Sequence, residues 1–306
     1  MKAPASVSGI LIVNKHAGVT SADIVNRLRR LYGTRQVGHT GTLDPMATGV
    51  LPVLIGRAVK AADFIVSENK RYTAEMRLGI TTDTEDTTGT VLTTSEELPG
   101  QAEVLDAAAR FVGDILQIPP MYSALKVNGK KLVDLAREGI TIEREARPIR
   151  IESLAAVRLS DNLYRLDVRC SKGTYIRTLC ADIGASLGCG AAMASLIRTE
   201  SGPFSLEDAI TVAQLEEMTS EERAACIIPL DRFFADCPSV HLSDFYARLA
   251  HNGCEVYQKK IGTTLPDGAL VRLYRSISEG DEFFALGRVM KYADGSAVKP
   301  VKLFVL

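Results

Sequence analysis

The loop that organises the N-terminal half of this sequence is Gly38–Val53, "GHTGTLDPMATGVLPV". It separates a basic helical segment from the apolar run Val50–Ile55, and its only carboxylate is Asp44. Pro45 restricts Asp44 to an extended conformation, and the nearby glycines allow the backbone to approach a ligand closely. The chemistry of the residues alone favours a turn aspartate that bonds its own backbone. The alternative is a reactive carboxylate held by a stiff loop.

The hydrophobic pattern on either side of this loop predicts both helices and strands. Gly9–Val13 and Val50–Ile55 are expected to be buried strands. Residues 20–32 are expected to form a helix capped by Thr20 or Ser21. Arg27 and Arg30 lie off the apolar face of this helix, where they are available to solvent or phosphate. The other predicted elements are helices at 57–66, 101–113 and 173–188, strands at 71–79, 148–159 and 163–171, and an acidic loop at 81–88.

Length and composition argue for two domains in a reducing compartment. The chain has 306 residues, and domains usually contain about 100–200. No apolar run is long enough to cross a membrane, and we expect no membrane association and a cytoplasmic location. The six cysteines form no C-x-x-C pair and have no neighbouring histidine cluster, which argues against a metal site and against a disulfide framework.

Charge is unevenly distributed along a chain whose formal net charge is only −1. Residues 24–43 contain four arginines and no acid, whereas residues 81–109 contain seven acids and no base. Such segregation permits a local anionic partner. Solvent-exposed faces of opposite sign are the simpler explanation, so charge alone does not establish nucleic-acid binding.

Two further segments differ in character from their surroundings. Residues 117–150 are basic and contain Asn128-Gly129, a tight hairpin-turn signal; we interpret them as an inserted, mobile arm that carries Lys126, Lys130 and Lys131 at its tip. The composition changes near residue 235, and short predicted strands follow. We therefore divide the chain into a domain at 1–235 and a small, mostly β domain at 236–306.

Three further residues, one of them inside the loop, have competing interpretations. Tyr72 follows an alternating apolar pattern, which is typical of core packing. Arg177 is next to an inner-face helical position, and a buried arginine needs a carboxylate partner. His39 has no second ligand nearby, so it is a base or a hydrogen-bonding residue rather than a metal ligand.

Several long motifs, in order, resemble the TruB family of tRNA pseudouridine-55 synthases. The loop above resembles the family's catalytic loop, and "KRYTAEMRLGITTDTEDTTG" from Lys70 resembles its second motif. "PPMYSALKVNGKKLVDLAREG" from Pro119 resembles its thumb-like insertion. "CSKGTYIRTLCADIGASLGCGA" from Cys170 resembles its third motif, and "LIRTESGPF" from Leu196 follows at a similar spacing. The resemblance covers residues 8 to about 235.

The resemblance implies a fold and an activity. It implies an α+β pseudouridine-synthase fold with a mixed, mainly antiparallel sheet, and a C-terminal module that is similar to a PUA domain. It implies an isomerase that flips a uridine out of the tRNA T-loop and converts it to pseudouridine, with no cofactor, no metal and no guide RNA, as a monomer.

The resemblance also implies roles for individual residues. Asp44 corresponds to the nucleophile, Arg177 to its ionic partner and Tyr72 to the tyrosine that stacks on the target base. Burial raises the pKa of a carboxyl group and a neighbouring guanidinium lowers it, so the chemistry requires Arg177 beside Asp44. The implied substrate-binding residues are His39, Tyr175, Leu196, Lys15, Lys126, Lys130 and Lys131. Thr42 and Ile197 depart from the family pattern, where alanine and arginine are frequent.

Two alternative functions stay open on the sequence. One is an RNA-binding or tRNA-folding module that has lost the reaction, although such a module has no need of a buried Asp44–Arg177 pair. The other is a related synthase that modifies a different RNA, with or without a guide. If the C-terminal domain does not contact RNA, it only supports the catalytic domain.

Overall fold

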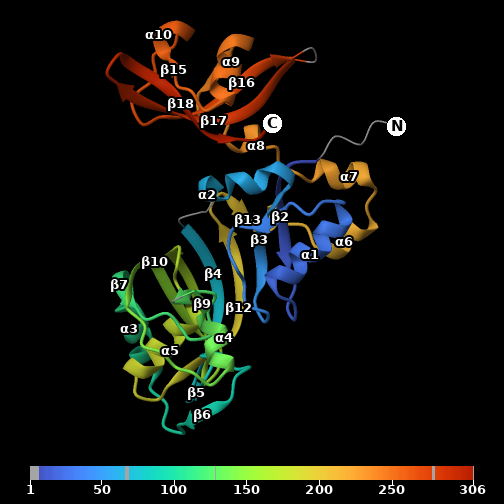
Figure 1. Ribbon diagram of the computed structural model, residues 1–306. Helices are drawn as coiled ribbons and strands as arrows, with labels where there is room; N and C mark the ends of the chain where they lie inside the picture. Colours follow the sequence, from blue (N-terminus) through green and yellow to red (C-terminus); the bar gives the residue numbers. More distant parts are fainter. Residues whose placement is uncertain (1–6, 66–68, 128, 278–279, 306) are drawn as a thin grey trace.

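A computed structural model describes residues 7–65, 69–127, 129–277 and 280–305 of the chain (Figure 1). These residues form a large mixed sheet with helices packed on it and, at the top of the view, a separate C-terminal β domain. This confirms the predicted α+β class. No helix in the described ranges is long and apolar enough to cross a membrane.

The large sheet has the order β1-β3-β12-β4-β11-β10-β7, and β2 and β13 pair with β3 and β12 at its margins. All of these pairings are antiparallel except β12 with β3. Its strands are β1 (Gly9–Lys15), β2 (Val37–His39), β3 (Thr48–Ile55), β4 (Asn69–Leu78), β7 (Gly113–Gln117), β10 (Arg147–Arg158), β11 (Leu163–Ser171), β12 (Ala191–Ser201) and β13 (Phe204–Ser205).

The strands β1 and β3 carry apolar side chains on both faces, and each face packs against a different hydrophobic cluster. Leu11 and Leu51 belong to the main core beneath α1, whereas Ile10 and Val50 belong to a second cluster that also contains Phe304 of the C-terminal domain. Continuous apolar runs are typical of such doubly buried strands. In β4 only one face is buried, and the predicted alternation through Tyr72 and its apolar neighbours is confirmed.

Helices from three parts of the chain cover the sheet. The helix α1 begins as predicted with a Thr20 cap that accepts a hydrogen bond from the Asp23 amide. The helices α3 and α5 pack against each other and against the other half of the sheet. The helical elements are α1 (Ser21–Leu31), η1 (Gly56–Ala61), α2 (Ala62–Ile65), α3 (Gln101–Ala109), α4 (Leu132–Arg137), α5 (Ile176–Ser186), η2 (Leu206–Asp208), α6 (Val212–Glu217), α7 (Ser220–Ala225) and α8 (Leu230–Phe233).

Several local predictions need correction. The acidic loop predicted at 81–88 begins inside β5 (Ile80–Thr82), which pairs with β6 (Val91–Thr94). The helix predicted at 101–113 ends at Ala109, because the chain turns there into β7. Leu105 and Val112, two apolar residues within the predicted range, are exposed. The helix predicted at 57–66 is instead the short 3₁₀ turn η1 followed by α2, and its Val66 lies outside the described residues.

The inserted segment forms a small hairpin and a helix. The short strands β8 (Lys126–Val127) and β9 (Lys130–Lys131) pair in antiparallel fashion, and α4 follows directly. The hairpin agrees with the predicted turn, of which Gly129 has a positive φ of 82°; Asn128 lies outside the described residues. The sequence did not predict α4.

The C-terminal domain has its own sheet, in the order β14-β16-β17-β18-β15, and its own apolar core. Leu286 from this sheet and Phe304, which follows its last strand, also join Ile10, Leu54 and Phe234 in the second cluster, which attaches the domain to the large sheet. Its elements are β14 (Ser239–Leu242), α9 (Asp244–His251), β15 (Val256–Tyr257), α10 (Gln258–Ile261), β16 (Leu270–Ile277), β17 (Gly280–Tyr292) and β18 (Gly295–Leu303).

Candidate active site

A cavity of about 880 Å³ lies where the Gly38–Val53 loop, the middle of the large sheet and the N-terminus of α5 meet. Among the described residues that line it, Asp44 is the only acid. The basic side chains in its lining are Lys70, Arg147, Lys172, Arg177 and Arg198. A cavity with this balance of charge suits an anionic ligand that places one reacting atom beside a carboxylate.

The loop that carries Asp44 is fixed at several points. The backbone oxygen of Asp44 accepts a hydrogen bond from the Ala47 amide, and the oxygen of Pro45 accepts one from the Gly18 amide. The Ser21 hydroxyl donates to the Leu43 oxygen and accepts from the Leu43 amide. The prediction of a stiff loop thus has a physical basis, and the side chain of Asp44 is not used to close its own turn.

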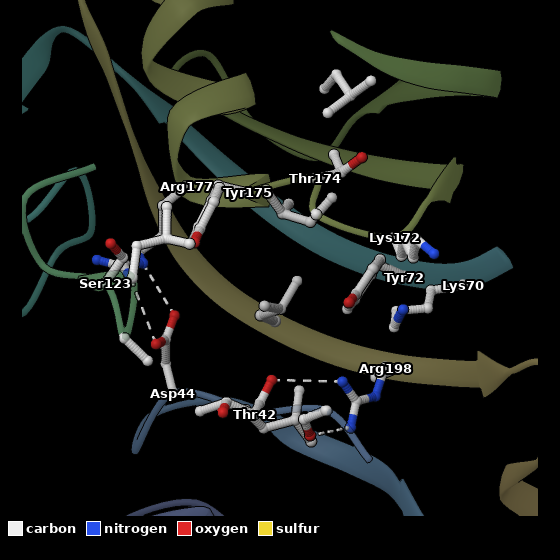
Figure 2. Close-up of a pocket in the computed structure, with 18 of the residues that line it drawn as sticks. Thr42, Asp44, Lys70, Tyr72, Ser123, Lys172, Thr174, Tyr175, Arg177 and Arg198 are labelled. Atoms are coloured by element: carbon white, nitrogen blue, oxygen red, sulfur yellow. Dashed lines mark hydrogen bonds and ion pairs between the residues drawn. The ribbon is translucent and has the colours of Figure 1, made fainter. Parts of the chain in front are cut away.

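Asp44 and Arg177 form an ion pair inside the cavity. The Arg177 Nε lies 2.9 Å from Asp44 Oδ2, and its Nη2 donates to Asp44 Oδ1 at 3.4 Å. Figure 2 shows the carboxylate of Asp44 directed at this guanidinium. Arg177 is only 5% exposed and Asp44 is 34% exposed, so the carboxylate faces the cavity while the guanidinium supports it from behind.

Three other groups hold the guanidinium of Arg177. Its Nη1 donates to the backbone oxygen of Thr84 at 2.9 Å, and its Nη2 donates to that of Tyr122 at 2.8 Å. The carboxylate of Asp86, itself buried, lies 3.9 Å from Nη1. The acidic segment after β5 and the start of the inserted segment therefore both contact the arginine that contacts Asp44.

Arg177 owes its place to the N-terminus of α5. Tyr175 precedes the helix, and its backbone exchanges two hydrogen bonds with the buried side chain of Gln117: the Tyr175 amide donates to Oε1 at 2.8 Å and Gln117 Nε2 donates to the Tyr175 oxygen at 3.0 Å. The ring of Tyr175 lines the cavity, and burial raises the pKa of its phenol. The contact of Tyr175 with the nucleotide stays a prediction.

Tyr72 and Leu196 both line the cavity from neighbouring strands of the sheet. Tyr72 projects from β4 and Leu196 from β12, and both are almost fully buried. Burial raises the pKa of Tyr72 above its usual value, and the charge and hydrogen bonding of Arg198 act against that rise. Tyr72 is part of the main core, as the core-packing interpretation expects, and it also lines the cavity. Its stacking on the target base stays a prediction.

Lys15 is placed behind the loop and not in the cavity. It is fully buried, and its Nζ donates to the backbone oxygens of His16, Val19 and Pro45 at 3.0, 2.8 and 3.2 Å. Burial lowers its pKa to about 8, against the opposing effect of Asp44. We therefore correct its classification as a substrate-binding residue, since its ammonium holds the backbone that follows Asp44.

His39 is the last residue of β2. Its neighbour Thr40 lines the cavity, whereas His39 does not. Its Nδ1 is buried and has no hydrogen-bond partner among the described residues. Burial, with a smaller effect of Arg198, lowers the pKa of His39, which favours a neutral ring.

The lysines of the inserted hairpin are exposed to solvent and lie outside the cavity. Lys126, Lys130 and Lys131 are not part of the cavity wall, although their neighbours Leu125 and Val133 are. Arg27, which the sequence left available for phosphate, pairs with Glu216 at 2.6 Å. Its guanidinium is therefore not an unpaired phosphate site.

Sequence reasoning missed Arg198, which is 1% exposed and lines the cavity. Side chains two positions apart on a strand share a face. Since Leu196 was expected at the target base, the same spacing should have placed Arg198 there. Ile197, which departs from the family pattern, lies between them and is 38% exposed. The contacts of Gln117, Tyr122 and Asp86 with the site had no comparable signal.

The arrangement brings together a carboxylate paired with a guanidinium, a buried tyrosine ring and a cationic wall. Figure 2 shows Asp44 and Arg177 on one side of the cavity and Tyr72, Arg198, Lys70 and Lys172 on the other. No group of three histidine, cysteine, aspartate or glutamate side chains in the described ranges is arranged to hold a metal ion.

Family comparisons match most of the chain. The model described as "TruB family pseudouridylate synthase (N terminal domain)" matches residues 29–176. The model described as "tRNA pseudouridylate synthase B C-terminal domain" matches residues 177–235.

Individual relatives match over nearly the full length. The protein named tRNA pseudouridine synthase B from Clostridium kluyveri is 43% identical over 98% of this chain and 100% of its own. The protein of the same name from Clostridium novyi is 42% identical over 97% of this chain and 100% of its own. Among solved structures, a Cbf5-Nop10-Gar1 complex contains a chain with a TM-score of 0.68 and 27% identity, covering 97% of this chain and 85% of that one.

Proposed function

This chain belongs to the TruB family of pseudouridylate synthases, and we propose that it isomerises uridine 55 in the T-loop of tRNA to pseudouridine. The activity class is that of its relatives, which are named tRNA pseudouridine synthase B. The proposal for the site rests on one observation: Asp44 is the only acid in a cationic cavity, and it is paired there with Arg177.

The reaction exchanges one bond of uracil for another without redox chemistry. The C1′–N1 bond breaks, the base turns, and C5 joins C1′. The C5 proton then leaves, its electron pair restores the C5–C6 double bond, and N1 gains a proton. The base is anionic when it departs and the sugar becomes electron-poor. A carboxylate at C1′ and cations around the base therefore match the charges that develop.

Asp44 is the group that acts at C1′ in this proposal. It can attack C1′, stabilise the electron-poor sugar or remove a 2′ proton, and each route requires the ionised form. Arg177 supports that form by contacts to both carboxylate oxygens. A guanidinium suits such two-point contact because its donors form a planar fork.

Tyr72 and Leu196 form the surface on which the base rests. Stacking on an aromatic ring is worth about 1–3 kcal/mol per base, which offsets part of the few kcal/mol needed to extrude a nucleotide. In this proposal His39, which lies next to the cavity and whose pKa burial lowers, replaces a contact of the extruded base. Lys126, Lys130 and Lys131 would contact backbone phosphates, which position RNA without reading its sequence.

The remaining proposals concern the chain as a whole. The division at residue 235 assigns 236–306 to a PUA-like RNA-binding domain, and the sheet that begins at β14 supports that assignment. The curated relatives are named for tRNA, which favours an unguided enzyme over a guided one. We propose that the protein works in the cytoplasm as a monomer.

The test is release of tritium from a T-loop RNA labelled at uracil C5. We expect the native protein to release tritium and Asp44→Asn to release none, while RNA affinity changes by less than about tenfold because phosphate contacts dominate binding. Asp161→Asn is the control, since Asp161 is an exposed acid outside the cavity.

The outcomes separate the alternatives. RNA binding without tritium release by the native protein would favour a non-catalytic module. Release from another RNA but not from the T-loop would favour a related synthase with a different substrate. Equal rates for native protein and Asp44→Asn would remove Asp44 from the mechanism.

A further inference from the structure

Arg198 is a buried cation that the proposed mechanism does not yet use. It is 1% exposed, and no carboxylate in the described part of the chain forms an ion pair with it. Burying a charge without an opposite charge is costly. A guanidinium that is buried in the cavity wall without a carboxylate partner is therefore expected to interact with another group of the site.

Arg198 is held rigidly by the two ends of the Asp44 loop. Its Nη2 donates to the Gly41 oxygen at 3.1 Å and its Nη1 to the Thr42 oxygen at 3.4 Å, before Asp44 (Figure 2). Its Nε donates to the Val50 oxygen at 2.7 Å, after the loop. These backbone contacts fix the plane of the guanidinium, so its position is set before any substrate binds.

The sheet places Arg198 directly beside Tyr72. The strand β12 lies between β3 and β4, and in this register Arg198 is opposite Tyr72 on β4 and opposite Gly49 on β3. Side chains directly opposite on one face have Cβ atoms about 4.5–5.5 Å apart. The register therefore places the two side chains next to each other on one face of the sheet, and Figure 2 shows both on the same side of the cavity. The charge and hydrogen bonding of Arg198 also act on the phenol of Tyr72.

We propose that Arg198 is a positioning residue for Tyr72, which orients the phenol and stabilises its phenolate for removal of the C5 proton. This inference rests on the proposed isomerase function. In the step concerned, the C5–H bond of the C1′–C5 intermediate breaks and an O–H bond forms on the phenolate of Tyr72. The C5–H electron pair becomes the C5–C6 double bond, and N1 takes a proton from water.

The electrostatics of the site support this role. Burial raises the pKa of Tyr72, which makes the phenolate scarce near neutral pH, and Arg198 lowers the pKa of the same group. A fixed cation is effective here because the side chains of Tyr72 and Arg198 are both almost fully buried, so little solvent screens their interaction. Tyr72 is part of a packed core, so the phenol cannot move to another partner without disturbing β4.

The experiment follows single-turnover isomerisation of T-loop RNA with hydrogen or deuterium at uracil C5. Arg198→Met removes the charge and keeps the length, and Arg198→Lys keeps the charge without the fork. Arg158→Met is the matched control, because Arg158 is a partly exposed arginine outside the cavity. Thermal melting and RNA affinity are measured for every variant.

We expect Arg198→Met to slow turnover by about 10²-fold, which is typical of the loss of general-base assistance. The expected signature is a primary deuterium isotope effect at C5 that is larger than that of native protein, with Arg198→Lys intermediate and Arg158→Met unchanged. Native-like turnover of Arg198→Met, or slower turnover with an unchanged isotope effect, would overturn the inference. Absence of turnover in the native protein would instead refute the proposed function.

Discussion

Replacing Arg177 by lysine tests the ion pair at the centre of the site. The native guanidinium contacts both oxygens of Asp44 and donates to the backbone oxygens of Thr84 and Tyr122. A lysine keeps the charge but lacks the fork, so it can replace only part of this set. One charge-assisted hydrogen bond is worth about 1.5–3 kcal/mol. If one such bond to Asp44 is lost in the transition state, the rate falls by about 10–10²-fold.

The assay is single-turnover tritium release at saturating RNA, with thermal unfolding measured in parallel. Loss of the contacts to Thr84 and Tyr122 should lower the free energy of unfolding by about 1–3 kcal/mol. Arg150→Lys is the control, because its ion pair with Asp114 is exposed and such pairs are worth about 0–1 kcal/mol. A stability loss with a native rate would show that the pair supports folding and not catalysis.

Three further predictions concern the loop and the inserted hairpin. Burial lowers the pKa of Lys15 to about 8, so the folded protein releases this proton at a lower pH than the unfolded chain does. The free energy of unfolding should therefore rise with pH, by at most about 1.4 kcal/mol per pH unit, between pH 8 and the usual pKa of lysine. Urea unfolding of Lys15→Met should not show this rise, and a pH profile equal to that of native protein would contradict the prediction. Gly49→Ala should destabilise the protein by more than about 2 kcal/mol in urea unfolding, because φ is +103° and the new Cβ would overlap the Arg198 backbone oxygen; near-native stability would refute this reasoning. Changing Lys126, Lys130 and Lys131 together to glutamine should reduce the slope of log affinity against log salt concentration by about 0.7 per lost phosphate contact. The rate at saturating RNA should stay unchanged. A native salt slope would show that these lysines do not contact the RNA.

Local sequence patterns predicted the elements whose environment repeats along the chain. The period-2 pattern around Tyr72 arises because one face of β4 meets a single core, and it was confirmed. The helix predicted at 173–188 forms as α5, although its first five residues, Arg177 among them, are all buried. The helix at 101–113 was predicted too long, because the apolar Val112 continued the pattern beyond Ala109 although the chain turns into β7. The periodicity of apolar residues in the sequence does not show where contacts with the rest of the fold end a helix or strand.

The sequence predicted a site residue only where the neighbouring residues made it unusual. Asp44 was conspicuous as a lone acid in a rigid loop, and the structure brings Arg177 to it from 133 positions away. Lys15 was associated with the site, but nothing local could show that its ammonium faces backbone oxygens instead of the cavity. Such distinctions depend on strand order, which joins β3, β12 and β4 from distant parts of the sequence.

The same strand order explains how a chain with a net charge of −1 builds a cationic reaction cavity. Lys70, Lys172 and Arg198 come from three separate segments and reach one wall, because β4, β11 and β12 are adjacent in the sheet. The acids of residues 81–109 are excluded from the cavity wall, and one of them, Asp86, instead lies behind Arg177. In the proposed mechanism, an anionic departing base would therefore face cations, while Asp44, the one carboxylate among the described residues of the cavity wall, keeps its own guanidinium. If exchanging Asp86 for asparagine left both the rate and the stability unchanged, this separation of charge would not be what holds Arg177 in place.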